Sequence, residues 1–200
     1  MDNPTESPIW QDLKSSYETD ASVTSLLLVK CTGGSNAEVE YCVRADGGGW
    51  TTVRSGDANI GKNGYGKTRE GDAKTPVGDY SGVSAFGIKP DPGTSMPYID
   101  VRETTFACDE DCEWYNRIID TAATGHDCKG EDMSAIAPAY NYGFTLDHNP
   151  ENLYPLGSAI FFHCKGLKPY TGGCIAVDED FMEQILKTCG SSPKVCIHLK

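Results

Sequence analysis

A histidine and a cysteine in the segment 158–177 have the residue types and the order that acyl transfer requires. An apolar run ends in His163, a short polar loop follows, and the turn Thr171-Gly172-Gly173-Cys174 leads into a second apolar run. This order can bring an imidazole and a thiol to the ends of two neighbouring strands. The imidazole can then take the thiol proton, and the thiolate can attack a carbonyl carbon to form a thioester.

The glycines before Cys174 are the expected binding residues for the acyl oxygen, because they leave backbone N–H groups open to it. Gly173 and Cys174 are the candidate donors, and Gly172 gives the turn conformational freedom. Thr171 has two interpretations, as a group that positions the histidine or the acyl group, or as a hydroxyl that stabilises the turn by local bonding. A cysteine after two glycines can equally be a small buried residue, so spacing alone leaves both roles open.

Two ordered blocks resemble the YkuD-type L,D-transpeptidases. The segment with His163 and Cys174 is similar to that family's active-site motif, and the block from Gly71 to Tyr80, GDAKTPVGDY, resembles a second family element. The resemblance spans about 26–199. Without the resemblance, the second block has two interpretations. It can form a wall of the substrate cleft, or it can be a structural turn that Pro76 fixes, and we favour the turn.

The resemblance implies a fold and an activity. The fold would be mainly β, a sandwich or distorted barrel with a few short helices. Cys174 would attack a peptidoglycan stem peptide, His163 would move the proton, and a second stem peptide would resolve the thioester into a 3→3 cross-link without a cofactor. The alternatives are an L,D-carboxypeptidase, in which water resolves the thioester, and a non-catalytic wall-binding module.

The chain departs from the family pattern at the turn. Many members carry a second histidine directly before Gly-Cys, where this chain has Gly172, and an Asn or Arg shortly after the cysteine, where this chain has Ile-Ala-Val. The resemblance therefore leaves open what orients the imidazole of His163. A backbone carbonyl is one candidate.

Composition limits the class of protein. The 200 residues fit one domain, and 22 glycines and 11 prolines favour a β-rich fold with many turns. The net charge of −12 argues against nucleic-acid binding, which needs clustered lysine and arginine. No run of residues approaches the length of a membrane span. The resemblance implies that the protein binds stem peptides, and we expect it to do so as a monomer.

The nine cysteines suggest an oxidising compartment. With Cys174 reserved as nucleophile, an even number remains, as a disulfide framework would leave. Cys189 with Cys196 is the expected local bridge, and another is expected among Cys108, Cys112 and Cys128. No signal peptide is visible at the start of the sequence, so the protein is either cytosolic or a mature fragment, and the cysteine count favours the fragment. We therefore expect a mature fragment that acts outside the cytoplasm, in the cell wall or secreted.

A metal site competes with the second bridge. Cys108, Cys112, His126 and Cys128 offer ligands that suit Zn²⁺, although their spacing matches no standard zinc pattern. The sequence favours disulfide bonding over zinc, so we expect no metal.

The organisation follows from periodicity. Residues 1–22 are expected to form a tail or short helix, and 23–200 the catalytic domain, with 89–138 as an insertion and possible lid. Period-two alternation predicts a strand at 38–44, and further strands are expected at 26–29, which reads as a buried run, and at 50–54, 140–147, 158–162 and 195–199. A loop is expected at 56–71 and a short helix at 113–120. Another helix is expected to begin after Asp178 as its N-cap and to end at Gly190. Its apolar face would carry Phe181, Met182, Ile185 and Leu186.

Overall fold

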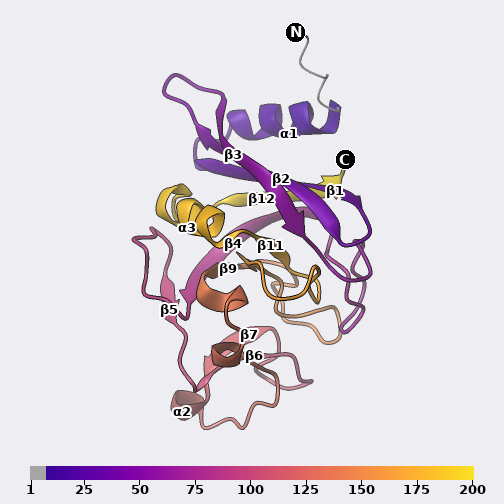
Figure 1. Cartoon of the computed structure of the whole chain (residues 1–200), viewed down its shortest axis with the longest axis vertical. Coiled ribbons are helices and arrows are strands. Elements are labelled where there is room, and N and C mark those ends of the chain that lie inside the picture. The colour runs from indigo at the N-terminus through magenta and orange to yellow at the C-terminus, as the bar shows by residue number, and fades with distance from the viewer. Residues whose placement is uncertain (1–7) are drawn as a thin grey trace.

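The centre of the computed structural model, which describes residues 8–200, is a closed β-barrel (Figure 1). Eight strands follow one another in the order β12-β1-β2-β3-β11-β10-β9-β4, and pairing of β4 with β12 closes the barrel. The short strand β5 extends the sheet beyond β4. These strands are β1 (Ser25–Gly33), β2 (Asn36–Arg44), β3 (Trp50–Asn59), β4 (Gly78–Gly87), β5 (Tyr98–Asp100), β9 (Gly143–Leu146), β10 (Phe161–Cys164), β11 (Ile175–Val177) and β12 (Lys194–Leu199).

The run Leu26-Leu27-Leu28-Val29 is apolar on both faces because both faces of β1 are covered. Leu27 and Val29 lie in the main core, whereas Leu26 and Leu28 lie in a second cluster on the outer face. Helix α1 (Pro8–Glu18) covers that outer face through Trp10, which is 1% exposed. The expected short helix therefore exists and packs against the barrel, while residues 1–7 of the expected tail lie outside the described residues.

Helix α3 (Glu179–Thr188) confirms the predicted helix after Asp178. Its four buried side chains are the predicted apolar face, Phe181, Met182, Ile185 and Leu186. The capping differs in detail, because the carboxylate of Asp178 pairs with Lys165 at 3.0 Å and makes no capping bond to the helix. Cys189 is the C-cap, and Gly190 follows it with φ of +76°.

The insertion forms a small unit at the end of the long axis opposite α1 (Figure 1). A three-stranded sheet in the order β7-β6-β8 builds it. The elements of this unit are β6 (Thr105–Cys108), β7 (Arg117–Asp120), α2 (Thr121–Thr124), β8 (Glu131–Asp132) and a 3₁₀ turn at Met133–Ala135. A second 3₁₀ turn, Ala139–Asn141, follows directly after the insertion.

The helix predicted over 113–120 is wrong. Residues 117–120 form β7, in which Ile118 and Ile119 pair with Ala107 and Phe106 of β6. Two consecutive β-branched residues favour a strand once a partner strand is present, and sequence reasoning had no partner to offer. The loop expected at 56–71 is also shorter than predicted, because β3 continues to Asn59 against β2.

The fold class is confirmed as mainly β, a distorted barrel with a few short helices. The expected bridges are not formed, because all nine cysteines, which lie within the described part of the chain, are free. Cys189 belongs to the main core and Cys196 to the cluster under α1, so the expected local pair is split between two clusters. Within residues 8–200, no helix is both long and apolar enough to cross a membrane.

We expect Trp10→Ala to lower the free energy of unfolding by about 3 kcal/mol or more, because it leaves a large cavity between α1 and β1. The Nε1–H of Trp10 is buried and has no hydrogen-bond partner among residues 8–200. Trp10→Phe, which removes that unpaired donor and keeps most of the ring, should change stability by only about 1 kcal/mol. Urea unfolding measures both. Equal loss in the two variants would contradict this account of the contact.

Candidate active site

Parallel pairing of β10 with β11 sets the relative positions of His163 and Cys174. In the register His163 lies opposite Ala176, and Phe162 lies opposite Ile175. Because side chains alternate along each strand, His163 shares a face with Ala176, and Cys174 projects near that face two residues earlier. The other face, with Cys164 and Val177, enters the main core.

The thiol of Cys174 is held by the backbone just before and within β10. Its Sγ lies 3.2 Å from the carbonyl oxygen of Ala159, to which the thiol donates, and accepts the N–H of Phe161 at 3.3 Å. Cys174 is only 7% exposed. These contacts fix the sulfur at the floor of the site.

The imidazole of His163 is oriented by a backbone carbonyl, the candidate that the sequence left open. Its Nδ1 lies 2.7 Å from the carbonyl oxygen of Cys164. A carbonyl can only accept, so Nδ1 carries the proton and Nε2 is left as the basic nitrogen. The ring of Tyr140 packs edge-on against the imidazole with the ring centroids 5.3 Å apart.

Burial keeps both groups neutral at rest. Desolvation raises the pKa of the Cys174 thiol to about 12, even though the Phe161 N–H favours the thiolate. Desolvation also lowers the pKa of His163 to about 4, against the opposing effect of the Cys164 and Ala139 carbonyls. No hydrogen bond joins His163 to Cys174 among the described residues. The resting site therefore holds a neutral thiol and a neutral imidazole.

Two threonine hydroxyls anchor the turn before β11. The hydroxyl of Thr171 donates to the carbonyl oxygen of Cys174 at 2.7 Å, and Thr75, which is fully buried, donates to the same oxygen at 3.3 Å. The N–H of Gly173 donates to the Thr171 hydroxyl at 3.1 Å. The Gly173 N–H is thus engaged within the turn, contrary to the expectation that it is open to an acyl oxygen.

Gly173 is a residue that the turn requires. Its φ is +148°, and a Cβ there would lie 2.8 Å from the Lys74 carbonyl oxygen. Gly172 is different, because a Cβ at that position would meet no atom within 4 Å. The predicted block at 71–80 therefore packs directly on the cysteine turn through Lys74 and Thr75.

A buried ion pair lies beside the turn. Lys67 Nζ is 3.0 Å from Asp72 Oδ1, and the two side chains are 2% and 8% exposed. Burial opposes ionisation of Asp72, but N–H donors from Thr68, Arg69 and Lys74 together with Lys67 lower its pKa to about 2. The charge on Lys67 lowers the pKa of Cys174, so it is the cation that favours the thiolate.

A carboxylate from the insertion acts on the thiol in the opposite sense to Lys67. Glu131 of β8 accepts a hydrogen bond from the hydroxyl of Tyr140. Burial raises the pKa of Glu131, and the charge on Glu131 raises that of Cys174. Cys174 is therefore subject to two opposing charges, because Lys67 stabilises its thiolate and Glu131 destabilises it.

His163 and Cys174 open into one cavity of about 580 Å³. Four of the five residues expected to form the site line this cavity, and these are His163, Thr171, Gly172 and Cys174. Gly173, the fifth, lies within the turn and packs against Lys74. Charged side chains of both signs share the lining, and these are Lys62, Lys67, Lys168, Glu70, Asp109 and Glu131.

Glu131 and Lys67 are site residues that sequence reasoning missed. Glu131 belongs to a short strand that reaches the cavity only by pairing with β6, so no local pattern marks it. Lys67 lies in the segment 56–71, for which the sequence predicts a loop. Its burial beside Asp72 depends on tertiary packing. No protein-family model and no curated protein matches this chain.

We expect Gly173→Ala to destabilise the fold by about 1–3 kcal/mol, since alanine is strained at this φ and its methyl group would contact Lys74. Gly172→Ala is the matched control and should unfold at nearly the wild-type denaturant concentration. Urea titration of both variants measures the difference. Equal stability of the two would show that the turn adapts to a side chain at either position.

The reaction of Cys174 with iodoacetamide should rise about tenfold per pH unit from pH 7 to 10 without reaching a plateau, because its thiol pKa is about 12. Peptide mapping isolates the Cys174 signal from the other cysteines, and N-acetylcysteine, which levels off above about pH 8.5, serves as the reference. Fast alkylation that is independent of pH across this range would instead reveal a resting thiolate–imidazolium pair.

Proposed function

We propose that this protein is a cysteine acyltransferase that forms 3→3 cross-links between peptidoglycan stem peptides. The observation that carries the proposal is the opening of His163 and Cys174 into one cavity, with an oriented imidazole and a glycine turn before the thiol. The resemblance of this segment and of the 71–80 block to YkuD-type L,D-transpeptidases supplies the substrate class.

In the proposed reaction, His163 acts as a general base. The Cys174 thiol turns from the Ala159 carbonyl toward Nε2 of His163, which takes its proton as sulfur attacks the carbonyl of the third stem residue. The carbonyls of Cys164 and Ala139 stabilise the imidazolium that forms. The bond to the terminal D-Ala then breaks, and the imidazolium returns the proton to the leaving amine.

The second half of the reaction resolves the thioester. The side-chain amine of another stem peptide attacks the acyl carbon, His163 takes the amine proton, and Cys174 leaves as the thiol. Water in place of the amine would give the L,D-carboxypeptidase product. Cys174 N–H and Gly172 N–H are the proposed donors to the oxyanion, because the Gly173 N–H is engaged with Thr171. One such donor contributes about 3 kcal/mol to the transition state.

The charges of the cavity suit a stem peptide, which carries a carboxylate and an amine. Lys62 and Lys168 flank Tyr170, with their ammonium groups 5.5 and 6.0 Å from the ring centroid, and offer cations to the terminal carboxylate. Asp109 and Glu131 on the insertion offer carboxylates to the amine. A peptidoglycan substrate would place the protein outside the cytoplasm. The proposed substrate is the only support for this location, because the cysteines are free and form no disulfide framework.

We expect incubation with a disaccharide-tetrapeptide to give a cross-linked dimer that has lost one D-Ala, detected by mass spectrometry. Cys174→Ala should give no product, because no nucleophile remains. His163→Gln should lower kcat/KM by about 10²–10⁴, because the general base is lost.

Cys31→Ala is the matched control, since Cys31 is a buried thiol in the main core and does not line the cavity. It should form the dimer at the wild-type rate. A tripeptide without dimer would assign the carboxypeptidase reaction. Full turnover by Cys174→Ala, or unchanged substrate with every stem peptide tried, would overturn the proposal, and the second result would favour a wall-binding module.

A further inference from the structure

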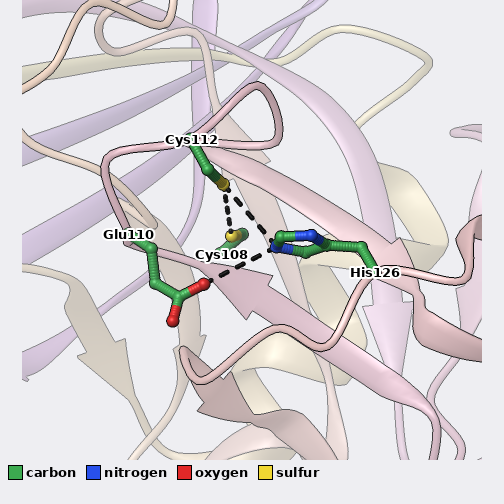
Figure 2. A group of neighbouring side chains, drawn as sticks. All are labelled: Cys108, Glu110, Cys112 and His126. Atoms are coloured by element: carbon green, nitrogen blue, oxygen red, sulfur yellow. Dashed lines mark hydrogen bonds and ion pairs between the residues drawn. The ribbon is translucent and has the colours of Figure 1, made fainter.

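Four potential metal ligands converge within the insertion, outside the proposed active site. Cys108 ends β6, Glu110 and Cys112 lie in the following loop, and His126 lies beyond α2; Figure 2 shows their side chains directed at one point. The four ligand atoms all lie within 4.8 Å of one another. Cys108 is buried, and the other three are partly exposed, so an ion can enter from solvent.

Three of the six distances between these atoms match the edges of a zinc tetrahedron, and the other three are within 4.8 Å. Cys108 Sγ and Cys112 Sγ are 3.5 Å apart, Cys112 Sγ and His126 Nε2 are 3.7 Å apart, and His126 Nε2 and Glu110 Oε2 are 3.6 Å apart. Bonds of 2.0–2.3 Å in a tetrahedral zinc site place neighbouring ligand atoms about 3.3–3.8 Å apart. We propose that Cys108, Cys112, His126 and Glu110 bind one Zn²⁺ ion.

Backbone N–H groups donate hydrogen bonds to two of the four proposed zinc ligands. The N–H of Trp114 donates to Cys112 Sγ at 3.4 Å, which favours the charged sulfur that a metal requires. The N–H of Lys129 donates to Glu110 Oε1 at 3.1 Å. This bond fixes the carboxylate and leaves Oε2 directed at His126.

A disulfide explains the cluster less completely than zinc does. A bond between Cys108 and Cys112 would join two sulfurs and give no role to the imidazole and the carboxylate that converge on them. Cys128, which lies in the same apolar cluster, accepts the N–H of Gly130 at 3.3 Å and is outside the four-ligand group. Zinc accounts for all four converging side chains at once.

The proposed ion would hold one wall of the active-site cavity. Ala107 and Asp109, the neighbours of Cys108 in sequence, line that cavity, and Ala107 pairs with Glu131. Zinc would tie the loop with Glu110 and Cys112 and the segment with His126 onto the end of β6. The ion has a structural role here, so the proposal does not depend on the acyl-transfer chemistry.

The test begins with the full chain, reduced, freed of metal by a chelator and then given excess Zn²⁺. After gel filtration, elemental mass spectrometry should find one zinc per chain. Cobalt(II) in place of zinc should give the thiolate charge-transfer and intense visible bands of a tetrahedral site. Cys112→Ser and His126→Ala should each weaken zinc binding more than about tenfold in competition with a chelator.

Matched controls change the same residue types elsewhere. Cys31→Ser, in the barrel core, and His198→Gln, paired with Asp79 at 2.8 Å, should bind zinc as tightly as wild type. A further measurement uses only the wild-type chain, so it does not depend on whether the variants fold. Zinc should protect Cys108 and Cys112 of that chain from alkylation. Sub-stoichiometric zinc in the reduced wild-type chain, tight binding by both ligand variants, or unchanged labelling of the two cysteines would overturn the proposal.

Discussion

Parallel pairing of β10 with β11 is the interaction on which the site depends. It places His163 opposite Ala176, so that Cys174, at the entrance to β11, meets the N–H of Phe161 at the entrance to β10. A shift of one residue would turn His163 into the core and Cys164 toward the cavity. The buried residues on the opposite face, such as Phe162 and Val177, make that shift costly, so the barrel core fixes the register that assembles the site.

The surroundings of the pair explain why it rests in the neutral form. Exclusion of water raises the pKa of the thiol and lowers that of the imidazole, and the two nearby charges, on Lys67 and Glu131, act in opposite directions on Cys174. In the proposed reaction, proton transfer would therefore occur only when a substrate carbonyl is present to accept the sulfur. A neutral resting thiol reacts slowly with other electrophiles, as the proposed nucleophile of a large substrate should.

The sequence predicted the parts of the fold that local periodicity controls. Alternation located β2, and the apolar spacing of Phe181, Met182, Ile185 and Leu186 located α3. The same reasoning placed His163 and Cys174 in one site, but not the hydrogen bonds of the thiol or the Gly173 N–H, because these depend on how the turn closes. Three features depend on contacts within the insertion that no local sequence pattern predicts. They are the strand β7, the position of the Glu131 carboxylate and the approach of His126 to Cys112.

The central claim is that Cys174 carries the acyl group, and intact-protein mass spectrometry after acid quenching tests it most directly. The protein is mixed with a tetrapeptide donor without an acceptor amine. The account predicts a mass increase equal to the stem tripeptide acyl group, located on the peptide that contains Cys174 and removed by hydroxylamine, as a thioester is. An adduct on another residue, or product formation by a chain in which Cys174 is blocked, would contradict it.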